Sequence, residues 1–216
     1  MSSSSQSLAG LPLILDHPRF LVVDKPAGLL SQPGLGPHQQ DSLISRLQHE
    51  CPDLRLVHRL DRDTSGLILL AKDLGMLRCL AGLFASRRVR KLYIAEVKGQ
   101  LVGLSGQVRL PLARLKRQPP TYGFHPEGKE CITLWRRLQL MKSSTRLWLS
   151  PRTGRSHQLR AHLAAQHHPI IGDPIYNPCC SASGLRLRAL ALRFPDPDDP
   201  RRQVRARAPM PAWAHP

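Results

Sequence analysis

HRLDRDTSGLILLAKD, residues 58–73, joins a polar loop to a run of apolar residues. The loop closes on Thr64, Ser65 and Gly66, which are residue types that favour turns. The run of residues after Gly66 is short, apolar and bounded by turn signals, as in a strand buried within a sheet. The stretch therefore predicts charged side chains presented at the end of a buried strand.

The flanking segments supply a further strand and two helices. FLVVDKPAGLL, residues 20–30, predicts a strand ended by Pro26 and Gly28. Residues 41–50 predict a helix with Asp41 or Ser42 as its N-cap, and the spacing of apolar residues in 74–89 predicts an amphipathic helix with a basic rim.

The remainder of the chain predicts mainly strands. Strands are expected at 91–99, 106–115, 131–140, 145–151, 185–194 and 202–210, a helix from Ser156 to before Pro169, and an exposed loop at 114–130. The order favours an α+β fold with a mostly antiparallel mixed sheet, flanked by helices and loops. We expect a mobile segment at 1–10 and one catalytic domain over 11–216, with a basic, proline-rich segment at 195–216.

The charge of the chain points to a polyanionic partner. Lys and Arg number 32 against 15 Asp and Glu, giving a formal net charge of +17 and a pI near 11.0. A preference for arginine codons would explain Arg over Lys but leaves the excess of positive charge unexplained. The distribution of charge through the chain favours nucleic acid.

Other classes of protein fit less well. No apolar run approaches the roughly 18 residues of a membrane span, and no basic segment precedes the first apolar stretch, so a cytoplasmic protein without membrane contact is expected. The 5 cysteines form no CxxC pair and are expected to be reduced thiols. His157 and His162 do not share one helix face, so no metal site is predicted.

Asp61 is the carboxylate most suited to chemistry. It lies between Arg59 and Arg62, and His58 is close by; nearby positive charges favour its ionised form. An ionised carboxylate suits a nucleophile or a general base better than a general acid. The alternative is that Asp61 or Asp63 only braces the turn, a role that suits Asp63 better.

Two further segments carry candidate site residues. RTGRSHQLRAH, residues 152–162, places several arginines around a glycine loop and a helix N-terminus, which predicts an anion site for phosphate or for a carboxylate of the chain. RKLYIAEV, residues 90–97, holds Tyr93 among aliphatic residues, where a core position is the alternative to a functional one.

Together these motifs resemble the RluA family of pseudouridine synthases. HRLDRDTSGLILLAKD, RKLYIAEV, TGRSHQLRAH, HPIIGDPIY and FLVVDKPAGLL stand in the family's order and spacing, and the resemblance runs from about residue 13 to about residue 195. The chain resembles the short form of the family, which has no S4-like module, and is similar to the branch that acts on both 23S rRNA and tRNA. The resemblance implies the pseudouridine synthase fold and an enzyme that isomerises uridine in structured RNA. A monomer is expected by default.

The resemblance also implies a role for each matched residue. Asp61 matches the nucleophile that attacks the target uridine, Tyr93 the tyrosine that packs on the base and helps remove the C5 proton, and Arg160 the arginine that pairs with the nucleophile. The matched RNA-binding and pocket residues are Arg59, which enters the RNA stack, His58 and Arg155 at the backbone, and Leu187 in the base pocket. No cofactor is implied, since the isomerisation changes no oxidation state and consumes no water or nucleotide.

Some features depart from the family or leave alternatives open. Arg188 stands where the family has histidine in LHA, and FPHP becomes FPDP at 194–197. The basic segment RRQVRARAPM is a last strand, an added RNA contact or a solvated edge. An RNA-binding assembly factor in which Asp61 braces a loop is a second hypothesis. A hydrolase with His58 or His157 beside an attacking water is a third.

Overall fold

The computed structural model describes residues 7–180 and 184–215, and the chain divides into two compact units. Unit 1 comprises the chain up to Arg90 together with Ala189–Pro209, and unit 2 comprises Lys91–Arg188 and Met210–Pro216. Within the described residues, no helix is long and apolar enough to cross a membrane. The predicted limits of a single catalytic domain stay a prediction.

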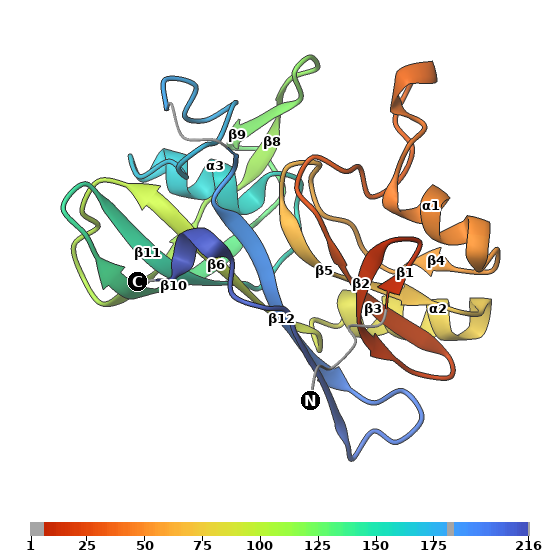
Figure 1. Cartoon of the computed structure of the whole chain (residues 1–216). Helices are drawn as coiled ribbons and strands as arrows, with labels where there is room; N and C mark the ends of the chain where they lie inside the picture. Colours follow the sequence, from red (N-terminus) through yellow and green to blue (C-terminus); the bar gives the residue numbers. More distant parts are fainter. Residues whose placement is uncertain (1–6, 181–183, 216) are drawn as a thin grey trace. The chain divides into compact units, whose positions relative to one another are not determined.

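Unit 1 is built on a sheet whose strands follow the order β1-β2-β3-β5-β12, with β13 paired to β12 and β4 to β5 (Figure 1). Its strands are β1 (Ser7–Leu8), β2 (Leu11–Asp16), β3 (Phe20–Lys25), β4 (Arg55–Leu56), β5 (Ser65–Ala71), β12 (Leu187–Pro195) and β13 (Gln203–Arg207). The first described residues therefore already pair, within the segment predicted to be mobile; residues 1–6 lie outside the described residues.

The helices of unit 1 follow the local sequence signals. They are η1 (Pro37–Gln39), α1 (Leu43–Glu50) and α2 (Leu74–Ala85). Ser42 caps α1 by accepting a hydrogen bond from the amide of Ser45, and Asp73 caps α2 through the amide of Met76. Ser42, one of the two caps expected for α1, is the observed one, and α2 begins at Leu74 as expected.

Unit 2 holds a second set of strands, in the order β6-β11-β10-β7, and a separate β8-β9 hairpin. Its elements are β6 (Arg90–Lys98), β7 (Ser105–Arg109), β8 (Leu112–Lys116), β9 (Thr121–Phe124), β10 (Ile132–Leu140), β11 (Ser144–Pro151), α3 (Gln158–Ala165) and η2 (Ala212–Ala214). Leu159 and Leu163 of α3 pack into one apolar cluster with residues of β6 and β11. This cluster is the core on which α3 rests.

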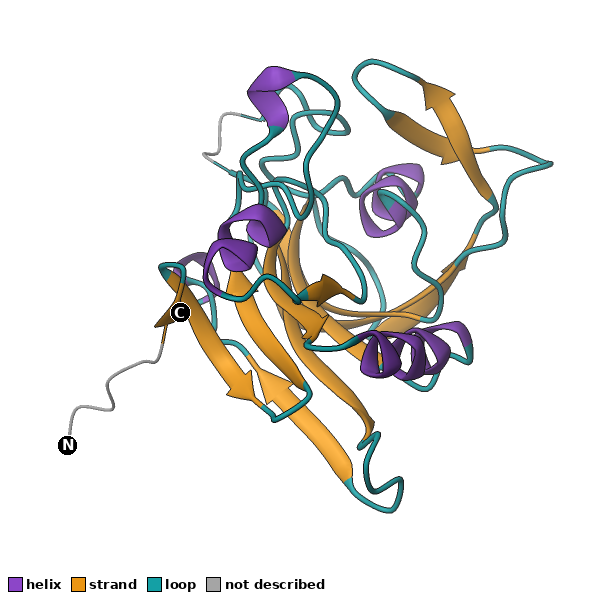
Figure 2. Ribbon diagram, turned by 90° about the vertical axis from the view of Figure 1, so that its right-hand side faces the viewer, coloured by secondary structure: helices purple, strands orange, loops and turns teal. Residues whose placement is uncertain are grey.

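The expected fold class is confirmed, and two local expectations are corrected. Strands dominate the regular structure (Figure 2), and the strand pairs whose register the described residues give are antiparallel. The single strand expected at 106–115 is two strands interrupted at Leu110 and Pro111, and the loop expected at 114–130 contains β9 and part of β8. The missed strand is β9, whose four residues are too few to show the alternation typical of a strand.

Candidate active site

The loop that carries Asp61 is fastened on both sides of this residue. Ser31 Oγ donates to the carbonyl of Leu60 at 2.8 Å and accepts from the amide of Leu60 at 3.1 Å. On the other side, the carbonyl of Arg62 accepts from Lys25 Nζ at 2.8 Å and from the amide of Gly28 at 3.0 Å. Asp61 is half-buried between these two anchors, so its backbone has little freedom to move.

Lys25 is the centre of this anchoring. Its side chain is completely buried, and Nζ donates to the carbonyls of Pro26 and Leu29 at 2.9 and 2.7 Å in addition to that of Arg62. Burial lowers the pKa of Lys25 to about 8. The negative charges of Asp63, Asp61 and Asp24 raise this pKa, but by less than burial lowers it. At neutral pH the ammonium is therefore charged, which supplies its three donors and a fixed positive charge near Asp61.

The two aspartates of the loop have different surroundings. The carbonyl of Asp61 accepts from the amide of Thr64 at 3.1 Å, which closes the turn. The carboxylate of Asp63 accepts from Arg62 Nε at 2.9 Å in a partly exposed ion pair. The role of Asp63 in bracing the turn stays a prediction.

His58 and Arg59 precede this loop and differ in exposure. His58 Nε2 accepts a hydrogen bond from the amide of Leu69 at 3.1 Å, and its ring stacks on Phe84 with 4.8 Å between centroids. Nε2 of His58 thus serves as a hydrogen-bond acceptor for the backbone of β5. Arg59 is exposed, as a residue that inserts into RNA must be. An RNA contact for either residue stays a prediction.

Two predicted base-pocket residues share one cluster in unit 2. Leu187 is 3% exposed and belongs to the core cluster under α3, and Tyr93 is half-buried and packs against the same cluster. Tyr93 therefore has a rigid apolar backing but is not enclosed by it. Such a position suits an aromatic ring that meets a flat partner.

Arg160 is held by a buried ion pair. Its Nε and Nη2 donate to Asp173 at 2.7 and 2.8 Å, and the guanidinium lies over the ring of Tyr176 at 5.3 Å. The carboxylate of Asp173 also accepts from the amides of Ile175 and Tyr176 at 2.9 and 3.0 Å. The predicted pairing of Arg160 with Asp61 concerns residues of different units and stays a prediction.

The electrostatics of Asp173 favour a permanent charge. Burial alone would raise the pKa of Asp173, but the hydrogen bonds and charge of Arg160 and the two backbone amides outweigh it and hold the pKa below its usual range. Sequence reasoning missed Asp173 and Lys25 as site residues. The only local signal was the position of each beside a proline within a motif, in DKP and GDP.

Arg155 lines a basic cleft of unit 2. The cleft has a volume of about 510 Å³ and includes Arg114, Lys129 and Tyr122. The amide of Arg155 donates to Gln158 Oε1 at 3.1 Å, and this fastens the loop to the first turn of α3 while the guanidinium stays exposed. Glu127 also lines the cleft, so its basic side chains outnumber its one acidic side chain.

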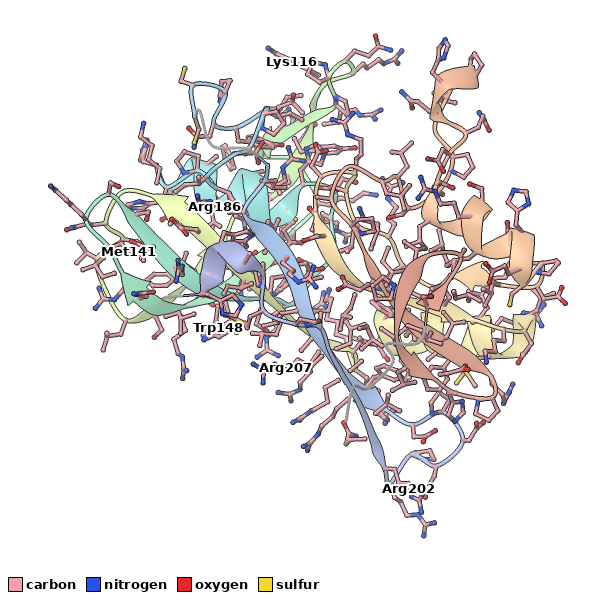
Figure 3. All side chains as sticks on the ribbon, in the orientation of Figure 1. Lys116, Met141, Trp148, Arg186, Arg202 and Arg207 are labelled. Atoms are coloured by element: carbon pink, nitrogen blue, oxygen red, sulfur yellow. The ribbon has the colours of Figure 1, made fainter. Side chains whose placement is uncertain are left out.

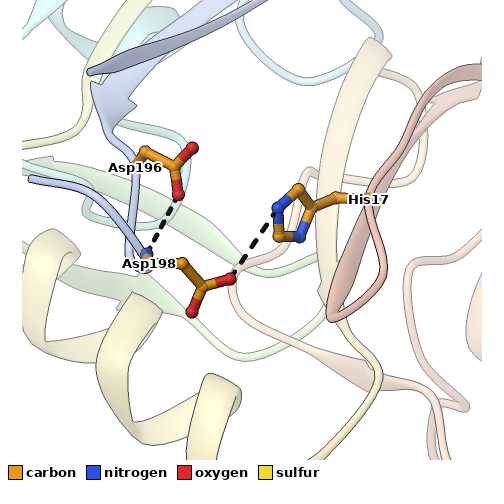
Figure 4. Close-up of side chains that lie close together, drawn as sticks. All are labelled: His17, Asp196 and Asp198. Atoms are coloured by element: carbon orange, nitrogen blue, oxygen red, sulfur yellow. Dashed lines mark hydrogen bonds and ion pairs between the residues drawn. The ribbon is translucent and has the colours of Figure 1, made fainter.

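A cluster of His17, Asp196 and Asp198 lies in unit 1 (Figure 4). Asp198 accepts from Arg19 Nη1 at 3.0 Å and lies 3.8 Å from His17 Nε2. Asp196 accepts from the amide of Asp198 at 3.0 Å. Ion pairing and turn formation account for these contacts.

Comparison with known proteins shows the family. A model of the family described as RNA pseudouridylate synthase matches residues 19–165. The sequence is 40% identical over 184 residues to the dual-specificity RNA pseudouridine synthase RluA of Yersinia pestis, which covers 83% of this chain and 89% of that protein. The protein of the same name from Escherichia coli K12 is 38% identical over 180 residues, 82% of each chain.

Solved structures confirm the expected fold. The structure of human RNA Pseudouridylate Synthase Domain Containing 1 superposes with a TM-score of 0.77 at 25% identity, covering 95% of this chain and 86% of that one. Human RNA Pseudouridylate Synthase Domain Containing 4 shares the same fold, with a TM-score of 0.76. The chain therefore belongs to the RluA family of pseudouridine synthases and is an RNA-modifying isomerase.

Proposed function

We propose that this enzyme converts specific uridines of structured RNA, in 23S rRNA, tRNA or both, to pseudouridine with Asp61 as nucleophile. The observation that carries the proposal is the 38–42% identity to proteins named dual-specificity RNA pseudouridine synthase, over most of the chain. The matched family segment includes Asp61, Tyr93 and Arg160. We also propose a cytoplasmic monomer that needs no cofactor.

The chemistry assigns the attack to the ionised carboxylate of Asp61. Asp61 bonds to C1′ of the uridine as the C1′–N1 bond breaks, the base turns, and a C1′–C5 bond forms as the bond between Asp61 and C1′ breaks. C5 loses a proton and N1 gains one, so the composition of the RNA is unchanged and the carboxylate is regenerated. The anchoring of Leu60 and Arg62 supports this role, since a nucleophile must be held in a productive orientation.

Tyr93 and Arg160 complete the proposed catalytic group. Tyr93 packs on the detached base and assists removal of the C5 proton, while Leu187 lines the pocket from the same cluster. Arg160 pairs with Asp61 and keeps it ionised and aimed. The two hydrogen bonds that Arg160 donates from Nε and Nη2 to Asp173 support this role, because they fix the plane of the guanidinium before RNA binds.

RNA binding is assigned to the basic surface. Extracting a uridine from its stack costs a few kcal/mol, and an inserted arginine with phosphate contacts offsets this. We assign the insertion to Arg59 and backbone contacts to His58 and Arg155. The exposed guanidinium of Arg155 in its basic cleft supports the last assignment. Unstacked loop bases and RNA shape are then the features that select the site.

The test is pseudouridine mapping of total RNA from cells that lack the protein, complemented with wild type, Asp61→Asn or Asp63→Asn. Asp63 is the matched control, being a carboxylate of the same turn that pairs with Arg62. We expect one or a few sites to vanish without the protein and to return with wild type and Asp63→Asn only.

The other outcomes separate the alternatives. If Asp61→Asn restores the sites, Asp61 is not the nucleophile. If no site depends on the protein at all, the RNA-binding assembly factor becomes the better description. If the wild type releases base or cleaves RNA instead of isomerising it, the hydrolase hypothesis holds.

A further inference from the structure

The hairpin of β12 and β13 carries arginines directly opposite one another. Arg193 pairs in register with Arg205, and Ala191 with Arg207. Residues opposite each other in an antiparallel pair point to the same face of the sheet, and residues two apart on a strand share that face. Arg193, Arg205 and Arg207 therefore form one surface, here called the arginine face.

The opposite face of the hairpin is part of the core. Leu192, Phe194 and Ala206 are at most 4% exposed, and the ring of Phe194 packs edge-on against Phe20 with 5.7 Å between centroids. Apolar burial thus holds the hairpin in place. Nothing in this packing calls for positive charge on the other face.

The arginine face lacks compensating acids. All three arginines are exposed, and the described residues give them no hydrogen bond or ion pair. The nearby carboxylates are engaged elsewhere, since Asp198 pairs with Arg19, and Asp199 pairs with Arg201 and Arg202. Like charges directly opposite in a sheet are destabilising, so the free enzyme carries an electrostatic penalty that a bound anion would remove.

The geometry points to a linear polyanion as the occupant. Arg205 and Arg207 are two residues apart, about 7 Å along the strand, which lets their guanidiniums meet successive backbone phosphates. Figure 3 shows Arg207, the last residue of β13, and Arg202 in the turn that precedes the strand.

We propose that the arginine face of Arg193, Arg205 and Arg207 binds the phosphate backbone of the substrate RNA outside the flipped nucleotide. The proposal rests on the proposed function, because it takes the RNA substrate as the occupant. These arginines act on RNA affinity and on its salt dependence. They do not contact the reacting atoms.

The test compares two variants that remove the same charge from the same hairpin. Arg193→Gln/Arg205→Gln removes two members of the arginine face, and the control Arg201→Gln/Arg202→Gln removes two loop arginines already paired with Asp199. Binding of unfractionated tRNA to the full chain is measured from about 50 to 200 mM salt. Thermal unfolding and the rate of pseudouridine formation at saturating RNA are measured alongside.

We expect the slope of log K against log salt to fall by about 1 to 2 for the arginine-face variant, with about 10-fold or greater loss of affinity at low salt, and to change little for the control. The arginine-face variant should unfold at the same or a higher temperature, because a repulsive pair is gone. Its maximal rate should equal that of wild type.

Two results would overturn the inference. One is an unchanged slope in the arginine-face variant while the wild type binds and isomerises RNA, which leaves the proposed function intact. The other is an equal loss of RNA affinity in both variants, which would show that the net charge of the protein, and not the arginine face, governs binding. A wild type that neither binds nor isomerises RNA would instead refute the proposed function itself.

Discussion

Arg160 and Asp173 form a two-point ion pair in the interior of unit 2, with Nε and Nη2 of the arginine 2.7 and 2.8 Å from the two carboxylate oxygens. The side chains are 3% and 0% exposed. Bidentate geometry fixes both the position and the plane of the guanidinium. Arg160, the arginine proposed to pair with Asp61, is thus held in place by Asp173, a carboxylate of its own unit.

Replacing Asp173 by asparagine should lower the free energy of unfolding by about 3–5 kcal/mol, because a buried guanidinium loses the carboxylate that neutralises it. Urea unfolding followed by circular dichroism measures this. The control is Asp41→Asn, which removes a carboxylate from an exposed pair with Arg46 and should have little effect because solvent screens that pair. Equal, small effects of both changes would contradict the importance of the buried pair.

The same pair predicts how stability depends on pH. The folded pKa of Asp173 lies below its unfolded value of about 3.9, so its contribution is fully present above that pH and is lost as pH falls through the folded pKa. The difference in unfolding free energy between wild type and Asp173→Asn should therefore be constant from pH 5 to 7 and shrink below about pH 4. A difference that stays constant in acid would show that the charge of Asp173 is not responsible.

Replacing Lys25 by methionine should destabilise the enzyme by about 2–5 kcal/mol, because three carbonyls around the Asp61 loop lose their donor. Turnover should fall as well, since the carbonyl of Arg62 is one of the three. Lys72→Met is the control, because Lys72 makes a surface ion pair with Asp16 worth at most about 1 kcal/mol. Wild-type turnover in Lys25→Met would mean that the loop holds its shape without this ammonium.

Gly66 cannot carry a side chain. Its φ is +114°, and a Cβ there would lie 2.1 Å from the carbonyl oxygen of Ala189 in β12. Gly66→Ala should therefore cost about 2–5 kcal/mol of stability. Gly82→Ala in α2 is the matched change, with no atom within 4 Å of the added Cβ, and should instead stabilise by about 0.5–1 kcal/mol. Thermal melts of both variants measure these changes. Destabilisation of Gly66→Ala alone would show that the close approach of β12 requires glycine at position 66.

His58 and Arg59 should separate structural from RNA-binding effects. His58→Phe preserves stacking on Phe84 but leaves the amide of Leu69 without its acceptor, so stability should fall by about 1–3 kcal/mol. RNA affinity should fall as well, because the proposed contact of His58 with the RNA backbone is lost. Arg59→Gln should leave stability within about 0.5 kcal/mol and reduce RNA turnover. Wild-type RNA affinity in a folded His58→Phe variant would contradict the backbone contact proposed for His58.

Several features could be predicted from the sequence because their causes are local. Ser42 caps α1 through Ser45, only three residues on, and the strands β12 and β13 follow from alternation on either side of a proline-rich turn. The motif around Asp61 identified the family, since the residue types that the chemistry requires are contiguous there. A cap, a turn or a motif needs no knowledge of the distant chain.

Tertiary structure alone decided the partners of the charged residues in the interior. Lys25 meets the carbonyl of Arg62, 37 residues away, and Arg160 meets Asp173 across the loop that follows α3. In sequence a buried lysine beside a proline is indistinguishable from an exposed one, since burial is a property of the path of the whole chain. The sequence therefore determined the family and predicted which residues carry the chemistry. The folded chain determined which charges and carbonyls surround them, because hydrogen bonds and ion pairs depend on distances that only folding creates.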